Sequence, residues 1–182
     1  MRIGIPYVTF YAFSTENWKR SPEEVDALMR LFKDYLLEAQ ADISQAGNIR
    51  LKFIGSRDGI SDELLRLMDQ GERDTAANTG TTVYVAINYG GRQEIVQAVN
   101  RALQSGKREI TMDDISANVY TVPDCDLVIR PSGEQRLSNF LLWQAAYSEF
   151  WYSDVLWPDF TEQDLAEALH AYENRNRRFG GR

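Results

Sequence analysis

Short runs of apolar, β-branched and aromatic residues alternate along this chain with longer segments that carry helix signals. Residues 5–12 form such a run, with no turn residue after Pro6, and residues 82–88 form another. Between them, residues 21–24 (Ser-Pro-Glu-Glu) combine an N-cap serine, a proline at the first helical position and a capping-box glutamate. Strands that alternate with helices are typical of α/β proteins with parallel strands. We therefore expect an α/β fold with a mainly parallel central sheet flanked by helices.

The remaining elements follow from the same periodicities and caps. Ile49, Leu51 and Phe53 alternate with charged residues, which predicts a strand with one polar face. The predicted strands are residues 5–12, 49–53, 82–88, 126–129 and 149–152. Helices are predicted from Ser21 to a stop at Gly47, from Ser61, after Gly91, after Thr111, from Leu137 to Tyr147, and from Thr161 through Arg175 and beyond.

Composition narrows the class of protein. The chain has 182 residues, 43% hydrophobic and 26% charged, as in an ordinary soluble protein. No repeat or linker interrupts it, so we expect one domain over residues 1–182. The net charge of −7 argues against nucleic-acid binding, which needs a basic face. Cys125 has no second cysteine to pair with and no apolar stretch could span a bilayer, so we expect a cytoplasmic protein.

Polar groups are concentrated after the first predicted strand. Ligands of open parallel sheets bind outside the carboxyl ends of the strands. Residues 13–20 supply two hydroxyls, a carboxylate, a carboxamide, an indole and two cations. An indole such as that of Trp18 among so many polar groups suits a ligand site. The alternative is a polar connection in which Trp18 covers the core. For residues 88–92, a glycine-enabled tight turn is the better-supported interpretation.

Two arginines follow the fourth predicted strand. Arg130 and Arg136 flank a Ser-Gly turn just ahead of the helix predicted from Leu137. Guanidinium groups beside the amides of a helix N-terminus would form a phosphate or diphosphate site. The alternative is a turn and helix cap with two solvated arginines, and the spacing alone does not separate the two.

Two further side chains could carry chemistry. Glu149 lies between Tyr147 and the aromatic run 150–152, and a carboxylate in a partly apolar setting needs an arginine, a helix terminus or a cation such as Mg²⁺. From the residues alone, a structural ion pair is the preferred interpretation. Cys125 has no base near it in the sequence and is interpreted as a loop residue rather than a nucleophile.

Six blocks, in order along nearly the whole chain, resemble signatures of one family. The blocks resemble those of cis-prenyltransferases of the undecaprenyl diphosphate synthase type, and they are Tyr11–Arg20, Asn88–Arg92, Asp126–Arg130, Ser132–Gln144, Asp154–Phe160 and Arg177–Gly181. The resemblance implies that family's fold. It also implies a reaction that joins isopentenyl diphosphate to an allylic diphosphate such as farnesyl diphosphate, with Mg²⁺ as the cofactor. The product would be a long-chain polyprenyl diphosphate, a membrane-associated lipid.

The resemblance also implies roles for single residues. Isopentenyl diphosphate would be held by Arg20, Arg130, Arg136 and Ser138, with Leu137 as a further substrate contact. The substrate site beside it would be shaped by Ser14, Thr15, Glu16 and Trp18. Asn17 matches the position of proton removal, although a neutral carboxamide is a poor base and would act as a relay or orienting group. Glu149 matches a Mg²⁺ ligand, which replaces the ion pair as the preferred interpretation. Arg178 and Gly180 match an element that reaches the partner's site in a homodimer.

Three features depart from the family pattern. Pro131 stands where threonine or serine is usual, and Gln135 stands where some members have histidine. The family also begins with a strand and an Asp-Gly-Asn-Gly-Arg-Trp loop whose aspartate binds Mg²⁺, and these 182 residues do not contain that motif. We therefore expect an N-terminally incomplete domain with little activity by itself. The alternative is a non-catalytic diphosphate-binding protein or dimer partner, but such a protein would have no chemical reason to keep Asn17, Glu149 and the arginines.

Overall fold

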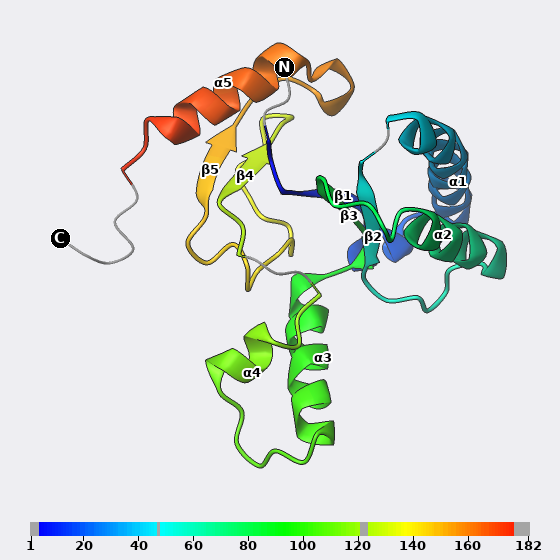
Figure 1. Cartoon of the computed structure of the whole chain (residues 1–182), viewed down its shortest axis with the longest axis vertical. Coiled ribbons are helices and arrows are strands. Elements are labelled where there is room, and N and C mark those ends of the chain that lie inside the picture. Colours follow the sequence, from blue (N-terminus) through cyan, green and yellow to red (C-terminus); the bar gives the residue numbers. More distant parts are fainter. Residues whose placement is uncertain (1–3, 47, 121–123, 177–182) are drawn as a thin grey trace. The chain divides into compact units, whose positions relative to one another are not determined.

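The computed structural model describes residues 4–46, 48–120 and 124–176, and the chain divides into two compact units, residues 1–90 and 91–182 (Figure 1). Each unit contains a sheet of parallel strands together with helices. The expected α/β class with parallel strands is therefore confirmed.

The first unit is built on a three-stranded parallel sheet in the order β1-β3-β2. Its elements are β1 (Tyr7–Ser14), the 3₁₀ helix η1 (Thr15–Lys19), α1 (Pro22–Ala46), β2 (Arg50–Ile54), α2 (Asp62–Asp74) and β3 (Thr82–Tyr89). Val83 of the central strand pairs with Val8 on one side and with Leu51 on the other. The last four residues of β3, 86–89, are buried.

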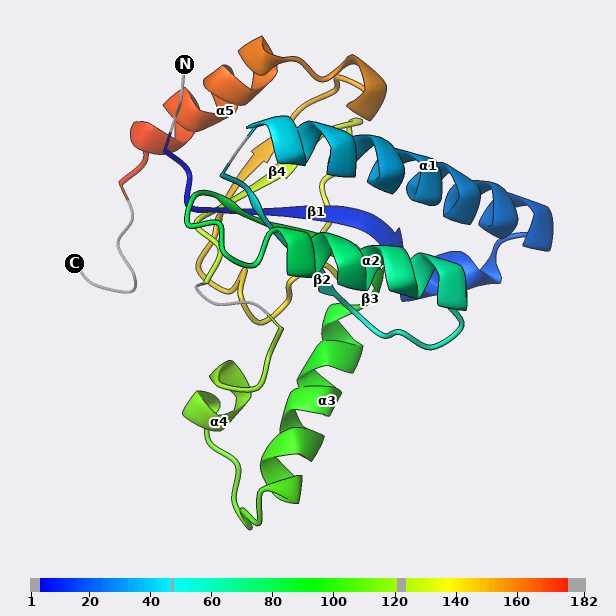
Figure 2. The same cartoon turned by 45° about the vertical axis from the view of Figure 1, so that its right-hand side comes forward.

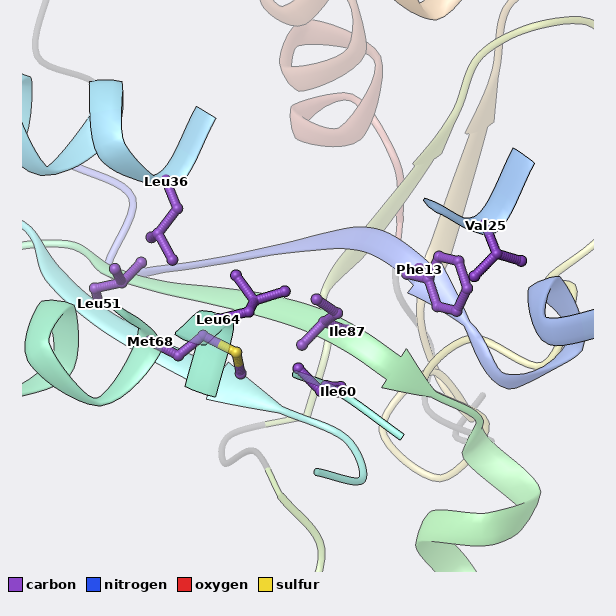
Figure 3. Packing of buried hydrophobic residues seen from close by; sticks show 8 residues of the cluster. All are labelled: Phe13, Val25, Leu36, Leu51, Ile60, Leu64, Met68 and Ile87. Atoms are coloured by element: carbon purple, nitrogen blue, oxygen red, sulfur yellow. The ribbon is translucent and has the colours of Figure 1, made fainter. Parts of the chain in front are cut away.

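The core of the first unit joins the sheet to its two long helices. Figure 2 shows α1 and α2 running side by side, and the two helices are in contact. Buried side chains from the strands, from both helices and from the segment before α2 form one cluster (Figure 3): Phe13, Val25, Leu36, Leu51, Ile60, Leu64, Met68 and Ile87. Full burial of a large apolar side chain contributes about 1.5–3 kcal/mol, so this cluster is the main source of the unit's stability.

Local caps determine where the helices of the first unit begin. Ser21 and Glu24 close a capping box at the start of α1, with both hydrogen bonds at 3.3 Å. The hydroxyl of Ser61 accepts from the amide of Leu64 at 3.3 Å and starts α2. Both predicted helix starts are confirmed. The predicted stop of the first helix at Gly47 lies outside the described residues.

The second unit has a smaller parallel sheet. Its elements are α3 (Gly91–Gln104), α4 (Met112–Ser116), β4 (Leu127–Arg130), β5 (Glu149–Tyr152), the 3₁₀ helix η2 (Trp157–Asp159) and α5 (Glu162–Glu173). Capping boxes at Thr111 and Thr161 begin α4 and α5, as predicted. The last helix ends at Glu173 rather than past Arg175, because the side-chain amide of Asn174 turns back to the carbonyl of His170 at 2.8 Å.

The helix predicted over residues 137–147 is wrong, since this segment is a series of turns. Ser138, Asn139 and Leu141 have φ values of 48°, 65° and 42°, in the left-handed region that a right-handed helix excludes. Asn139 instead caps α3: its carbonyl accepts from the amide of Gly91 at 2.7 Å, and its Oδ1 accepts from the amide of Arg92 at 2.9 Å. The polar groups of Asn139 thus satisfy the first amide donors of α3.

Candidate functional site

The segment that follows β1 is a turn of 3₁₀ helix held by a capping box. Ser14 is the last residue of β1, and its amide donates to Oδ1 of Asn17 at 2.8 Å. The Ser14 side chain accepts in turn from the Asn17 backbone. Because Oδ1 of Asn17 already accepts a backbone hydrogen bond, the Nδ2 hydrogens are the groups that can be directed at a ligand. This geometry suits an orienting group rather than a base.

The other polar residues of this segment lie at the surface. Thr15 donates to Glu16 through a 3.2 Å hydrogen bond between their side chains. Arg20 ends the 3₁₀ turn, with its amide bonded to the carbonyl of Asn17 at 3.0 Å and its side chain exposed. The first unit therefore brings Ser14, Thr15, Glu16, Asn17, Trp18 and Arg20 together at the carboxyl end of β1.

Trp18 is held on three sides. Its indole Nε1 donates to Oδ1 of Asn88 at 2.7 Å. Its ring meets Phe13 edge-on, with centroids 5.1 Å apart, and Gly59 lies against the six-membered part of the ring. The side chain is nevertheless 38% exposed, so part of a fixed apolar surface remains open to a ligand. The alternative role, in which Trp18 covers the core, holds only in part: Trp18 contacts the core residue Phe13 but remains partly exposed.

Asn88 is a functional candidate that the sequence interpretation missed. It lies near the end of β3, is only 5% exposed and has φ of 48°. Its amide nitrogen donates to the carbonyls of Ser56 at 3.2 Å and Asp58 at 2.9 Å, in the loop after β2. Asparagine tolerates the left-handed region better than most residues, and Asn88 lies at an irregularity of β3, where Phe13 pairs with Ile87 and Ser14 with Tyr89. The interpretation of residues 88–92 as a tight turn is wrong, because β3 continues to Tyr89. Gly91 instead begins α3.

In the second unit, Arg130 ends β4 and is half-buried. The turn after it is formed by Ser132 and Gly133, with φ values of 74° and 70°. Their amides donate to the carbonyls of Val155 at 2.8 Å and Ser153 at 2.9 Å. These two amides hold the turn to the chain after β5. The expected anion site at a helix N-terminus is wrong, because no helix begins at Leu137. The charge of the arginines remains as the attraction for an anion.

Arg136 is exposed and forms an ion pair with Glu134. Leu137 is half-buried, and Ser138 is exposed with φ of 48°. A non-glycine residue in the left-handed region costs roughly 1–3 kcal/mol and is often found at binding sites. The end of β4 and the loop that follows it therefore present two arginines and a strained serine on the same stretch of chain.

Glu149 is the first residue of β5, and its side chain is 24% exposed. Its Oε2 accepts from Nη1 of Arg175 at 2.7 Å, and Nη2 of Arg175 donates to the carbonyl of Phe150 at 3.0 Å. The sheet register pairs Glu149 with Leu127, three residues before Arg130, which is about 10 Å along a strand. Within the second unit, Glu149 and Arg130 thus belong to opposite ends of the same strand pair.

The donor chemistry of Glu149 fits one ligand of a magnesium ion. A carboxylate oxygen is a ligand that Mg²⁺ prefers, and proteins commonly hold this ion with one or two carboxylates, water and substrate phosphates. Among the described residues, no three or more His, Cys, Asp or Glu side chains gather as a metal site. A magnesium ion at Glu149 would accordingly take most of its ligands from substrate and water.

Cys125 is half-buried, and its thiol donates to the carbonyl of Leu127 at 3.2 Å. Burial raises the pKa of this thiol, and the hydrogen bonds with Ser148 and Leu127 offset that rise only in part. A raised pKa lowers the fraction of reactive thiolate, in agreement with the interpretation of Cys125 as a loop residue.

Arg178 and Gly180, which the resemblance places at a partner's site, lie outside the described residues. No helix in the described part of the chain is long and apolar enough to cross a membrane.

Comparisons with known proteins agree with the sequence blocks. The family model "Putative undecaprenyl diphosphate synthase" matches residues 1–180. The isoprenyl transferase of Clostridium perfringens is 46% identical over 188 residues, which cover 99% of this chain and 74% of that protein. The isoprenyl transferase of Fusobacterium nucleatum is 47% identical over 180 residues, covering 98% and 78%.

Two solved structures share the fold of this chain. A probable undecaprenyl diphosphate synthase from Campylobacter jejuni has 34% identity and a TM-score of 0.91, covering 96% of this chain and 83% of that one. The lavandulyl diphosphate synthase of Lavandula x intermedia, solved in complex with dimethylallyl diphosphate, has 36% identity and a TM-score of 0.92, covering 97% and 80%.

Proposed function

Since the chain belongs to the undecaprenyl diphosphate synthase family, we propose that it is a prenyltransferase that elongates cis-prenyl chains. It would condense isopentenyl diphosphate with an allylic diphosphate such as farnesyl diphosphate, giving a long-chain polyprenyl diphosphate of the undecaprenyl type. The observation that carries the proposal is the match to this family along almost the whole chain. The bound dimethylallyl diphosphate of the lavender relative supports an allylic diphosphate as one substrate.

The reaction needs positive charge where diphosphate binds. As the carbon–oxygen bond of the allylic diphosphate breaks, negative charge develops on the leaving group and must be stabilised. Isopentenyl diphosphate must also be held so that its double bond attacks the allylic carbon. Arg130 and Arg136 are the candidates for its diphosphate, because planar guanidinium groups bind phosphate oxygens in pairs. Diphosphate would displace Glu134 from Arg136, an exchange that costs little at an exposed ion pair. Leu137 and Ser138 are proposed as neighbouring contacts.

The residues after β1 have proposed roles in orienting substrate. Trp18 offers a fixed apolar surface, and Asn17 offers amide hydrogens from a capped turn. Ser14, Thr15 and Glu16 would complete the polar surroundings, and Arg20 would contribute a further cation. Asn17 would orient the group that accepts the proton released from isopentenyl diphosphate after carbon–carbon bond formation, since its own amide cannot hold that proton.

We propose Mg²⁺ as the cofactor, with Glu149 as one ligand. When bound, the ion would neutralise diphosphate charge. Glu149 would exchange its ion pair with Arg175 for the metal. The support is the hard oxygen donor of Glu149 and the resemblance at this position.

The assembly and the location of the protein are also proposals. We propose one domain over residues 1–182, supported by the continuous family match, and a homodimer in which Arg178 and Gly180 reach the partner's substrate. A cytoplasmic enzyme would deliver its lipid product to a membrane. Sedimentation of the purified chain tests the dimer, and a monomer at micromolar concentration would contradict it.

The function is tested by incorporation of radiolabelled isopentenyl diphosphate. The chain is incubated with farnesyl diphosphate and Mg²⁺, and label is measured in the organic extract. Matched reactions contain EDTA in place of Mg²⁺ or omit farnesyl diphosphate. Any longer chain read from the same coding region is assayed in parallel.

The outcomes separate the two candidate functions. Label in long-chain product that depends on Mg²⁺ and on farnesyl diphosphate supports the synthase. Binding of isopentenyl diphosphate without turnover by either form favours the non-catalytic alternative. Neither binding nor turnover would overturn the proposed function.

A further inference from the structure

Asn88 connects the segments that follow all three strands of the first unit. Its Oδ1 accepts from Trp18 at 2.7 Å, in the turn after β1. Its Nδ2 donates to the carbonyls of Ser56 and Asp58, after β2, at 3.2 and 2.9 Å. Asn88 itself lies near the end of β3, so one side chain joins the carboxyl ends of β1, β2 and β3.

The backbone is shaped to allow these contacts. The carbonyl of Asn88 accepts from the amide of Ser56 at 3.0 Å, which brings the end of β3 against the loop after β2. Gly55 makes this approach possible, because a Cβ there would overlap the carbonyl oxygen of Ile87. The φ of 48° at Asn88 directs its side chain away from the regular strand alternation. A conformation this unusual in a buried residue requires support from its surroundings, which the hydrogen bonds provide.

The consequence is a fixed indole. The hydrogen bond to Asn88 holds the polar edge of Trp18, while Phe13 and Gly59 confine the ring. Trp18 is the residue next to Asn17 and two residues before Arg20, so its position also sets the 3₁₀ turn that carries both. A group held in this way loses little freedom when a ligand binds.

We infer that Asn88 is a positioning residue that fixes Trp18 and its 3₁₀ turn for substrate, and that the loop from Gly55 to Gly59 belongs to the same functional end of the first unit. The inference rests on the proposed function only in that the 3₁₀ turn binds substrate. The hydrogen-bonded connection acts in the unliganded protein and can be measured there.

The test compares Asn88→Gly with a matched control, Asn78→Gly. Glycine adopts a φ of 48° without strain, so Asn88→Gly removes the side-chain bonds without straining the backbone. Asn78 also ties two segments of the first unit, through a 2.8 Å hydrogen bond to the carbonyl of Ile49, but it does so ahead of β2 and β3. Each variant loses an asparagine tie, at opposite ends of the same sheet.

The first readout is the indole N–H resonance of Trp18 in the unliganded protein, assigned as the one of four tryptophan signals that Trp18→Phe removes. In Asn88→Gly this resonance should shift, and its hydrogen should exchange about tenfold faster, the scale of one lost buried hydrogen bond. Asn78→Gly should leave it in place. Asn88→Asp keeps the oxygen that accepts from Trp18 but loses both amide donors, so it should retain the resonance while the amides of residues 56–59 exchange faster.

The second readout is the KM for isopentenyl diphosphate, which should rise about tenfold in Asn88→Gly with a smaller change in kcat. Asn78→Gly should lower thermal stability without raising KM. An unmoved Trp18 resonance in Asn88→Gly, or equal KM effects of the two glycine variants, would overturn the inference. If neither the wild-type chain nor a longer form binds or turns over isopentenyl diphosphate, the proposed function fails, while the resonance and exchange measurements still decide whether Asn88 positions Trp18.

Discussion

The guanidinium of Arg175 lies 2.7 Å from Oε2 of Glu149, the carboxylate proposed to bind magnesium. The same arginine also donates to the carbonyl of Phe150, so the residue just beyond α5 is attached to β5 at two points. Any cation that binds Glu149 must compete with Arg175. The pair therefore sets the ease with which the carboxylate accepts a metal.

We expect Arg175→Gln to lower the Mg²⁺ concentration needed for half-maximal activity by a few-fold, because exposed ion pairs of this kind are worth about 0.2–1 kcal/mol. A titration of activity against Mg²⁺ measures this, and a Mg²⁺-dependent shift in Tm gives a readout independent of turnover. Arg101→Gln is the control, since Arg101 also bonds a backbone carbonyl in the second unit, that of Asn118 at 3.0 Å. An unchanged or higher Mg²⁺ requirement would argue against Glu149 as a ligand.

Arg130→Lys should raise the KM for isopentenyl diphosphate by about tenfold or more, because lysine keeps the charge and loses the planar pair of donors. The kcat should change less, since binding rather than bond breaking is affected. Arg108→Ala removes an exposed arginine of the same unit and serves as the control. Steady-state kinetics with wild-type values for Arg130→Lys would remove this residue from the substrate site.

Gly55→Ala should destabilise the protein by about 2–4 kcal/mol, from backbone strain and overlap with the carbonyl of Ile87. Gly106→Ala separates the two causes: Gly106 has φ of 91°, and its added Cβ would meet open space, so about 1 kcal/mol is expected. Chemical denaturation measures both. Equal losses of unfolding free energy in the two variants would mean that the close approach at Gly55 does not contribute to the destabilisation.

The stability of the second unit should depend on pH through Asp114. The ion pair with Lys107, and hydrogen bonds from the amide and hydroxyl of Thr111, lower the pKa of Asp114 from 3.8 to about 2. A carboxyl whose pKa is lower in the folded state stabilises the fold fully above its unfolded pKa and loses this effect as the pH falls through its folded pKa. The stabilisation should therefore be present at neutral pH and disappear between about pH 4 and pH 2.

Denaturation of wild type and Asp114→Asn from about pH 6 to about pH 2 tests this linkage. The variant should be less stable at the higher pH, and the difference should shrink as the pH falls. Asp113→Asn, at an exposed neighbour in the same helical turn, is the control and should change stability less. A difference that stays constant over the whole range would contradict the assignment.

Cys125 should react slowly with iodoacetamide at neutral pH, because burial raises the pKa of its thiol. We expect alkylation about tenfold slower than in the chain unfolded by urea, which is the internal control. Mass spectrometry gives an unambiguous readout, because the chain has one cysteine. Equal rates in the folded and unfolded chains would show that the thiol is open and reactive.

Local signals predicted the fold well where the physical cause was itself local. Ser61, Thr111 and Thr161 each begin a helix where the sequence indicated, because an N-cap bonds to an amide three residues away. The helix predicted after Leu137 was wrong because the apolar spacing of that segment suits a helix. In the structure, the polar groups of Asn139 instead cap α3. One of the residues they bond, Arg92, is 47 positions away in the sequence.

The candidate site shows the same division. The residues from Ser14 to Arg20 could be selected from their chemistry, because so many functional groups follow one strand. Asn88 and Arg175 could not be selected in this way. Asn88 matters because it bonds Trp18, 70 positions away, and Arg175 because it bonds Glu149, 26 positions away. No local pattern records such a contact before the chain is folded.

Because Asn139 caps α3, the turns around residue 139 and the first turn of α3 should unfold cooperatively. The amides of Gly91 and Arg92 are bonded to Asn139 rather than to their own helix. Local opening of the turns around residue 139 therefore also frees the first turn of α3 to fray. The loop that follows the arginines and the start of that helix should open as one unit, with a shared protection against hydrogen exchange.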